Sequence, residues 1–221
     1  MYKNDVKIDN KMKTIITRDW LKEFPSYKKF RPQAWEKIVG PLSFHIGYNV
    51  DWGTNVKIGF SIFNLANPLD FMCATLHIVP KSRRYSITWK QHEEGKYREA
   101  AEELRQLSMV AIEGPVKLSQ VIEAYQNYPD LKYTSDDRYF EDPALIAAWA
   151  GKPGLAKELL DWGLPWYAKN CNIYPDEQEL WYQSMLSKIS DPEGLRRTVE
   201  EQVVFHKLTK LPYEELIIDM D

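Results

Sequence analysis

The chain has 221 residues, of which 44% are hydrophobic and 28% charged. The composition is that of a globular protein, and the chain is long enough for one large domain or two small ones. It contains no apolar run that could span a membrane, and the N-terminal residues MYKNDVKIDNKMK lack the apolar stretch of a secretory signal. Cys73 and Cys171 lie far apart, which argues against a disulfide framework and favours a reducing compartment. We therefore expect a soluble cytoplasmic protein.

The net charge of −3 hides an asymmetry between the two halves of the chain. Residues 1–110 contain 18 Lys and Arg against 12 Asp and Glu, whereas residues 111–221 contain 11 against 20. A split of this kind indicates either an acidic surface for a basic partner or a solvated helical surface.

The first forty residues predict two short helices. Residues 1–14 are polar and are expected to form a frayed start. Thr17 fits the N-cap of a first helix, RDWLKEF. The segment RPQAWEKIVG, residues 31–40, predicts a second helix, with Pro32 in its first turn and Gly40 at its C-terminal end.

Alternating apolar and polar residues then predict an antiparallel sheet. Leu42–Val50 alternates strictly, Asp51-Trp52-Gly53-Thr54 supplies a turn, and residues 56–62 alternate again, so these segments predict a hairpin. Phe71–Val79 is apolar on both faces, as in a central strand. Tyr85–Trp89 is a further alternating strand, followed by a polar loop. Four strands in sequence order indicate a meander.

From Tyr97 onward the apolar period is helical. Residues 127–141 are expected to form an Asp-rich loop, and the residues after Leu211-Pro212 an acidic tail. The predicted helices cover residues 97–111, 118–125, 142–150, 153–162, 176–189 and 192–210. We therefore expect an α+β fold, with a four-stranded antiparallel meander sheet in region 1–95 and a helical region 96–221, joined in one cooperative unit.

Residues 142–164, DPALIAAWAGKPGLAKELLDWGLP, indicate a pair of helices. Asp142-Pro143 suits an N-cap and a first helical position, Gly151 the turn, and Gly163 the end of the second helix. This segment resembles the helix pair of an ankyrin repeat. Because a repeat array needs several copies and only one is found, we expect a single ankyrin-like αα-hairpin packed on the sheet.

The sequence does not predict a catalytic or metal centre. Its four histidines have no metal-binding spacing, its cysteines have no zinc spacing, and it contains neither a Gly-rich phosphate loop nor a G-x-S-x-G segment. We therefore expect no cofactor and no metal. The basic turn around Arg83 and Arg84 lies beside Tyr85 and Trp89, but these aromatic residues fall on the face predicted to be buried, which argues against nucleic acid as a partner.

Two groups of residues are candidates for binding a partner. The polar face of the predicted hairpin is either a solvated surface or a flat recognition face, with His45, Asn49 and Lys57 as candidate contacts. The acidic half offers a second group, which would speed the encounter with a basic protein. That group consists of Asp130, Asp136, Asp137, Tyr139 and Glu141.

A sheet with covering helices, abundant aromatic residues, an acidic half and the segment FSIFNLANPLDF resembles bacterial immunity proteins, which neutralise a cognate polymorphic toxin. The resemblance implies a non-catalytic protein that needs no cofactor and binds a protein partner, such as a basic toxin domain. Two alternatives stay open. One is a small-molecule-binding protein or hydrolase with a pocket between sheet and helices, in which His45 or His77 faces carboxylates. The other is an ankyrin-like scaffold subunit.

Overall fold

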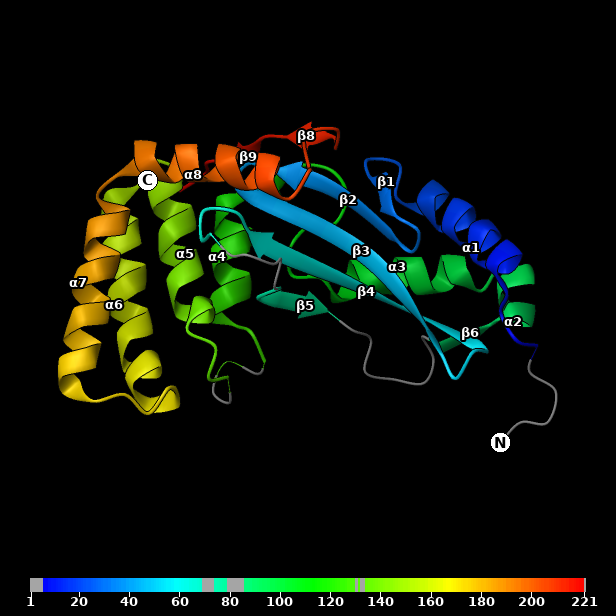
Figure 1. The fold of residues 1–221 in the computed structure, drawn as a ribbon, viewed down its shortest axis with the longest axis horizontal. Coiled ribbons are helices and arrows are strands. Elements are labelled where there is room, and N and C mark those ends of the chain that lie inside the picture. Colours follow the sequence, from blue (N-terminus) through cyan, green and yellow to red (C-terminus); the bar gives the residue numbers. More distant parts are fainter. Residues whose placement is uncertain (1–5, 69–73, 79–85, 130, 132–133, 221) are drawn as a thin grey trace.

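The structure is a computed structural model that describes residues 6–68, 74–78, 86–129, 131 and 134–220. An antiparallel sheet occupies the N-terminal half and helices dominate the C-terminal half (Figure 1), which confirms the predicted α+β class. In the described part of the chain, no helix is both long and apolar enough to cross a membrane.

The helices are α1 Asn10–Glu23, α2 Trp89–Glu93, α3 Tyr97–Leu107, α4 Leu118–Gln126, α5 Arg138–Trp149, α6 Pro153–Asn170, α7 Pro175–Ile189 and α8 Pro192–Phe205. The strands are β1 Lys28–Arg31, β2 Ala34–Val39, β3 Leu42–Asp51, β4 Asn55–Asn64, β5 Leu76–Ile78, β6 Ser86–Thr88, β7 Val116–Lys117, β8 Tyr213–Glu214 and β9 Leu216–Ile217.

Strands β1 to β5 follow one another across the main sheet in sequence order, each antiparallel to the next. Strand β6 also pairs with β4, and β8 adds to β2 in parallel, so the sheet is larger than the predicted four strands. The described part of Phe71–Val79 contains β5, which lies at the end of this order and not at its centre. A separate two-stranded sheet joins β7 and β9.

The predicted β3–β4 hairpin is confirmed. Phe44, Ile46 and Phe60 point into the core with at most 1% of their surface exposed, and polar residues alternate with them on the opposite face. The turn is made possible by two left-handed residues, Trp52 with φ of 52° and Gly53 with φ of 76°. Such φ values suit the tight turns that join antiparallel strands.

The predicted bounds of the first N-terminal helix are wrong, and the second predicted helix is a strand in the structure. Helix α1 begins at Asn10, where the carboxylate of Asp9 accepts a hydrogen bond from the Met12 amide, so residues 10–14 are helical. Thr17 is buried inside that helix and is not its N-cap. Residues 31–40 form the end of β1, a turn and β2. All six residues of β2 are buried, so this segment lacks the alternation that marks a half-exposed strand.

Helix α6 continues through Gly163 to Asn170, so the predicted end at Gly163 is wrong. A β-carbon at Gly163 would lie only 3.1 Å from the carbonyl oxygen of Phe140. The glycine therefore lets α5 and α6 pack closely. Gly151, with φ of 76°, makes the predicted turn between these helices, and α7 is confirmed near its predicted bounds. Helix α8 begins at Pro192 as predicted but ends at Phe205, before the predicted end at residue 210.

The segment after α8 is not a free acidic tail. It forms β8 and β9, and the Glu214 carboxylate lies 2.8 Å from the fully buried Nζ of Lys37 on β2. Helices α3 and α4 lie behind the main sheet in Figure 1, and α5 to α8 gather at one end. One hydrophobic cluster contains residues of the sheet and of the C-terminal helices. The front face of the sheet carries the groove described next.

Candidate functional site

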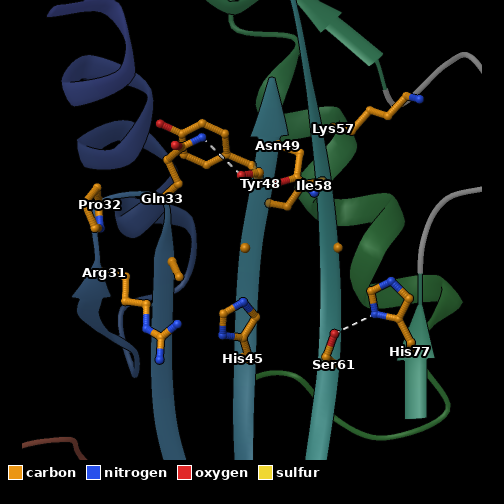
Figure 2. Close-up of a pocket in the computed structure, with 13 residues that line it drawn as sticks. Arg31, Pro32, Gln33, His45, Tyr48, Asn49, Lys57, Ile58, Ser61 and His77 are labelled. Carbon is orange, nitrogen blue, oxygen red and sulfur yellow. Dashed lines mark hydrogen bonds between the residues drawn. The ribbon is translucent and has the colours of Figure 1, made fainter. Parts of the chain in front are cut away.

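A groove of about 450 Å³ lies on the front face of the sheet (Figure 2). Strands β1 to β5 supply most of its lining, which combines polar side chains with the backbone of two paired glycines, Gly47 and Gly59. We call it the polar groove. Its lining residues are Arg31, Pro32, Gln33, Ala34, His45, Gly47, Tyr48, Asn49, Lys57, Ile58, Gly59, Ser61 and His77.

A row of polar residues from four neighbouring strands crosses the sheet at the polar groove, and three of them, His45, Ser61 and His77, line it. Glu36 on β2 is paired with His45 on β3, His45 with Ser61 on β4, and Ser61 with His77 on β5. Because residues paired across a sheet point to the same face, the register alone brings these four side chains together.

His45 is held in one orientation by three neighbours. Its Nδ1 lies 2.7 Å from Oε1 of Glu36, and its ring meets that of Phe63 edge-on, with 5.8 Å between ring centroids. Its Nε2 occupies the space above Gly47, where a β-carbon on residue 47 would lie only 2.5 Å from that nitrogen. Glu36 is 2% exposed, and its second oxygen makes no hydrogen bond to any described residue. The imidazole therefore presents Nε2 on the groove side.

The other half of the row is a serine–histidine pair. Ser61 Oγ lies 2.6 Å from Nδ1 of His77, and Figure 2 shows this contact next to His45. Desolvation lowers the pKa of His77, and the nearby His45 lowers it further. The lowered pKa favours the neutral imidazole, which can accept a proton from the serine hydroxyl.

The rim of the polar groove carries two cationic residues, Arg31 from β1 and Lys57 from β4. Lys57 forms an ion pair with Asp51 and lies opposite Asn49 in the strand register. None of the described residues that line the groove is acidic, since the buried Glu36 and the hairpin residue Asp51 are both outside the lining. The groove is therefore rich in hydrogen-bond donors.

The structure brings together the three hairpin residues that the sequence predicted as contacts, since His45, Asn49 and Lys57 all line the polar groove. It adds Arg31 and Glu36, which the sequence placed in a helix. The described lining of the groove comes from β1 to β5 and the β1–β2 turn, whereas the alternative hypothesis expected a pocket between sheet and helices. In the described ranges no group of three His, Cys, Asp or Glu residues could hold a metal ion.

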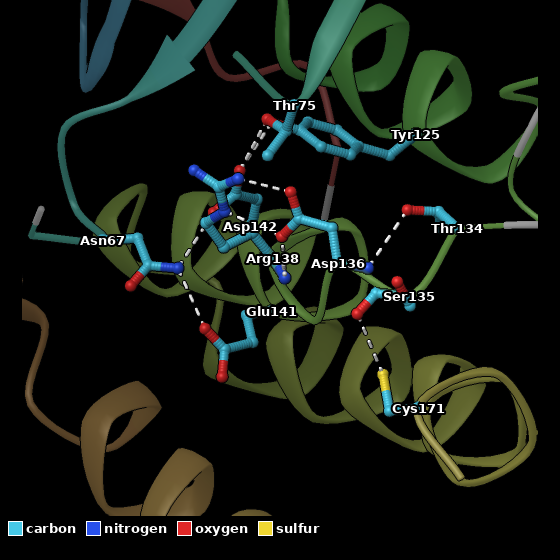
Figure 3. Close-up of polar contacts among 10 residues, drawn as sticks. All are labelled: Asn67, Thr75, Tyr125, Thr134, Ser135, Asp136, Arg138, Glu141, Asp142 and Cys171. Atoms are coloured by element: carbon cyan, nitrogen blue, oxygen red, sulfur yellow. Dashed lines mark hydrogen bonds and ion pairs between the residues drawn. The ribbon is translucent and has the colours of Figure 1, made fainter. Parts of the chain in front are cut away.

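The predicted acidic residues do not gather into one exposed cluster. Asp136 is ion-paired with Arg138, whose Nε lies 2.7 Å away, and Asp137 is exposed. Tyr139 and Glu141 are each only 8% exposed. The Glu141 carboxylate accepts hydrogen bonds from Trp181 and Asn67, as Figure 3 shows for Asn67. Asp130 lies outside the described residues.

Asp142 is not the predicted N-cap, because α5 begins at Arg138 and Asp142 is buried within it. Burial is the main reason that its pKa rises to about 6, while its hydrogen bonds oppose this rise. The carboxylate ties α5 to the sheet end and to α4 (Figure 3). Its donors are Asn64 and Asn67 at Oδ1, and Thr75 and Tyr125 at Oδ2.

The polar groove is thus an open, donor-rich surface with one oriented imidazole, and the Asp142 cluster is an internal connection between sheet and helices. Comparison of the chain with models of protein families, with curated proteins and with solved structures gives no match. The function is therefore argued from the geometry of these residues.

Proposed function

We propose that the protein is a non-catalytic binding protein and that a protein partner docks in the polar groove. The observation that carries this proposal is the oriented row on the floor, where His45 is fixed by Glu36, Phe63 and the space above Gly47. Polar groups that are already ordered lose little conformational entropy on binding, so they favour complex formation.

The shape of the floor also supports docking of another chain. Gly47 and Gly59 lie opposite each other in the register, so no side chain projects from these two positions. The His45 ring fills the space above Gly47, so a partner meets the edge of this imidazole, with Ser61 beside it on β4 and Asn49 and Lys57 further along the strands. Contacts that extend over several strands bury more surface than a contact with one side chain.

A bacterial toxin is the partner class that the sequence resemblance suggests, and the protein would then act as a cytoplasmic immunity protein. The sequence predicts that such a partner would bind the acidic residues Asp136 and Asp137. The polar groove is a second surface with different chemistry, and the two can be tested separately with variants of exposed residues.

The test is affinity capture from the native host, identification of the captured protein by mass spectrometry, and titration of the purified pair. We expect Asn49→Trp, which adds bulk without charge at an exposed groove position, to weaken the complex by at least about tenfold. The matched control is Glu158→Trp on the exposed face of α6, for which the affinity should not change. An unchanged affinity for Asn49→Trp would exclude the groove as the docking site. Loss on charge reversal at Asp136 and Asp137 would assign the acidic surface instead.

The Ser61–His77 pair supports a second candidate function, hydrolysis of an ester or amide. A serine hydroxyl within hydrogen-bond reach of a neutral imidazole is the arrangement that activates a nucleophile. A fluorophosphonate probe should then label the wild-type protein but not Ser61→Ala, with peptide mapping of the labelled site. Absence of label on Ser61 would reject the hydrolase hypothesis and leave the binding function.

A further inference from the structure

The charged side chains on the rim of the polar groove have one sign. Arg31 comes from β1 and Lys57 from β4, and Figure 2 shows them at opposite ends of the lining. The histidines His45 and His77 lie in the row between β3 and β5. No acidic side chain is found among the described lining residues, although the protein as a whole carries a net charge of −3.

We propose that the partner segment that binds in the polar groove is acidic, and that its carboxylates contact Arg31, Lys57 and His45. This inference rests on the proposed binding function and names the chemistry of the partner. It differs from the basic partner that the sequence suggested, because that partner was assigned to the acidic half of the chain.

Arg31 is the least compensated cation of the groove. It is exposed, its guanidinium lies over the ring of Phe30 at 5.2 Å, and its fork of donors can bind a carboxylate through two parallel hydrogen bonds. Lys57 is partly neutralised by Asp51, but its side chain is 52% exposed and can be shared with a second carboxylate. The Asn49 amide beside Lys57 adds neutral donors.

His45 completes the set because Glu36 lies on the other side of its ring. The buried Glu36 carboxylate contacts Nδ1, so Nε2 is the atom that a ligand can reach. When both ring nitrogens carry protons, the imidazolium bridges Glu36 and a carboxylate of the partner by two charge-assisted hydrogen bonds. A basic side chain at the same place would instead meet the cations of the rim.

The probes are fluorescein-labelled hexaglutamate and hexaglutamine peptides, followed by fluorescence anisotropy with the full chain at low salt. These peptides have similar size, so the difference between them reports charge. We expect hexaglutamate to bind at least about tenfold more tightly than hexaglutamine, and the difference to shrink as salt is added. Equal binding of the two peptides would overturn the proposal.

Variants locate the binding site. Arg31→Gln and Lys57→Gln should each weaken hexaglutamate binding by about threefold or more, because each removes one exposed charge pair. Lys90→Gln is the control, since the Lys90 side chain is 85% exposed and lies outside the groove. Circular dichroism checks that all three variants are folded. If Arg31→Gln and Lys57→Gln behave like Lys90→Gln, hexaglutamate binds elsewhere and the proposal is wrong.

A labelled oligothymidylate of about ten nucleotides tests the other common source of negative charge. Tighter binding of this probe than of hexaglutamate, with the same dependence on Arg31 and Lys57, would replace the acidic protein segment by nucleic acid. The peptide assay is also separate from the capture experiment. If the captured partner depends on Asn49 but hexaglutamate does not bind, the acidic segment is rejected and the binding function is kept. If hexaglutamate binding depends on the groove but the captured partner is insensitive to Asn49→Trp, the groove binds acidic segments and is not the docking site of that partner.

Discussion

Oε1 of Glu36 and Nδ1 of His45 lie 2.7 Å apart on neighbouring strands, and this contact decides which nitrogen of the imidazole faces the polar groove. Glu36 is 2% exposed, so water has little access to its carboxylate. The ring then has room only because position 47, two residues along the same strand face, is glycine.

The first prediction concerns that space. Gly47→Ala would place a β-carbon 2.5 Å from Nε2 of His45, so the imidazole must rotate away from its present position. Because the obstructing atom is the end of a side chain, the fold should tolerate the change, with a free energy of unfolding within about 1 kcal/mol of wild type. Binding of hexaglutamate or of the captured partner should weaken by about tenfold, measured by anisotropy or titration calorimetry.

Gly154→Ala is the matched control for Gly47→Ala. A β-carbon at Gly154 meets no described atom within 4 Å, and the position lies in the first turn of α6, away from the groove. This variant should leave binding unchanged. If Gly47→Ala also binds normally, the orientation of His45 has no part in recognition.

Asp142 predicts a distinctive pH dependence. Its pKa rises from 3.8 to about 6 in the folded protein, chiefly by burial. Between these values the folded state binds more protons than the unfolded state, so the contribution of Asp142 to stability is greatest below pH 3.8 and decreases as the pH rises through about 6. The decrease amounts to about 3 kcal/mol, and urea unfolding at several pH values between 4 and 7 measures it.

Asp142→Asn isolates this effect from the other carboxylates. An amide oxygen can still accept from Asn64 and Asn67, and the amide nitrogen can donate to the hydroxyls of Thr75 and Tyr125. The stability of wild type relative to Asp142→Asn should therefore fall between pH 4 and 7, in favour of the variant. A difference that stays constant over this range would show that Asp142 keeps its ordinary pKa.

The buried Lys37 and its partner Glu214 predict unequal effects of substitution. Nζ of Lys37 lies 2.8 Å from Glu214 and over the rings of Tyr27 and Phe44 at 5.0 and 5.8 Å. Glu214→Ala should destabilise the protein by about 2 kcal/mol, because it leaves a buried ammonium without its carboxylate. Lys37→Met should change stability by less than about 1 kcal/mol, since a methionine fits between the two rings. Equal losses in urea unfolding would contradict this account.

The contrast between β3 and β2 shows how far sequence patterns predict this sheet. Strand β3 is buried on one face, so its residues alternate and the hairpin could be recognised, including the turn at Gly53. Strand β2 is buried along its whole length, with β8 from the far end of the chain at its side. Alternation is therefore absent there, and Pro32 and Gly40 suit the ends of a helix as well as the turns of a hairpin.

The polar groove was only partly predictable for the same reason. His45, Asn49 and Lys57 share one face of a recognisable hairpin, so local alternation was enough to group them. Arg31 and His77 join them through pairings of β1 with β2 and of β4 with β5, which depend on the arrangement of the whole sheet. Asp142 was misassigned because Asp followed by Pro is the usual start of a helix, while its real partners lie between 17 and 78 residues away.

Trp52 supports a last prediction, about the tip of the β3–β4 hairpin. Its φ of 52° is rare for a residue with a bulky side chain, and 94% of its surface is exposed, so packing contributes little to offset the backbone strain. Asparagine adopts this conformation more easily, and Trp52→Asn should raise the free energy of unfolding by about 1 kcal/mol. Trp52→Ala removes the same ring but keeps an unfavourable φ, so it should give no such gain. A similar increase for both variants in urea unfolding would attribute the effect to loss of the exposed ring, and destabilisation by Trp52→Asn would show that the indole stabilises the turn.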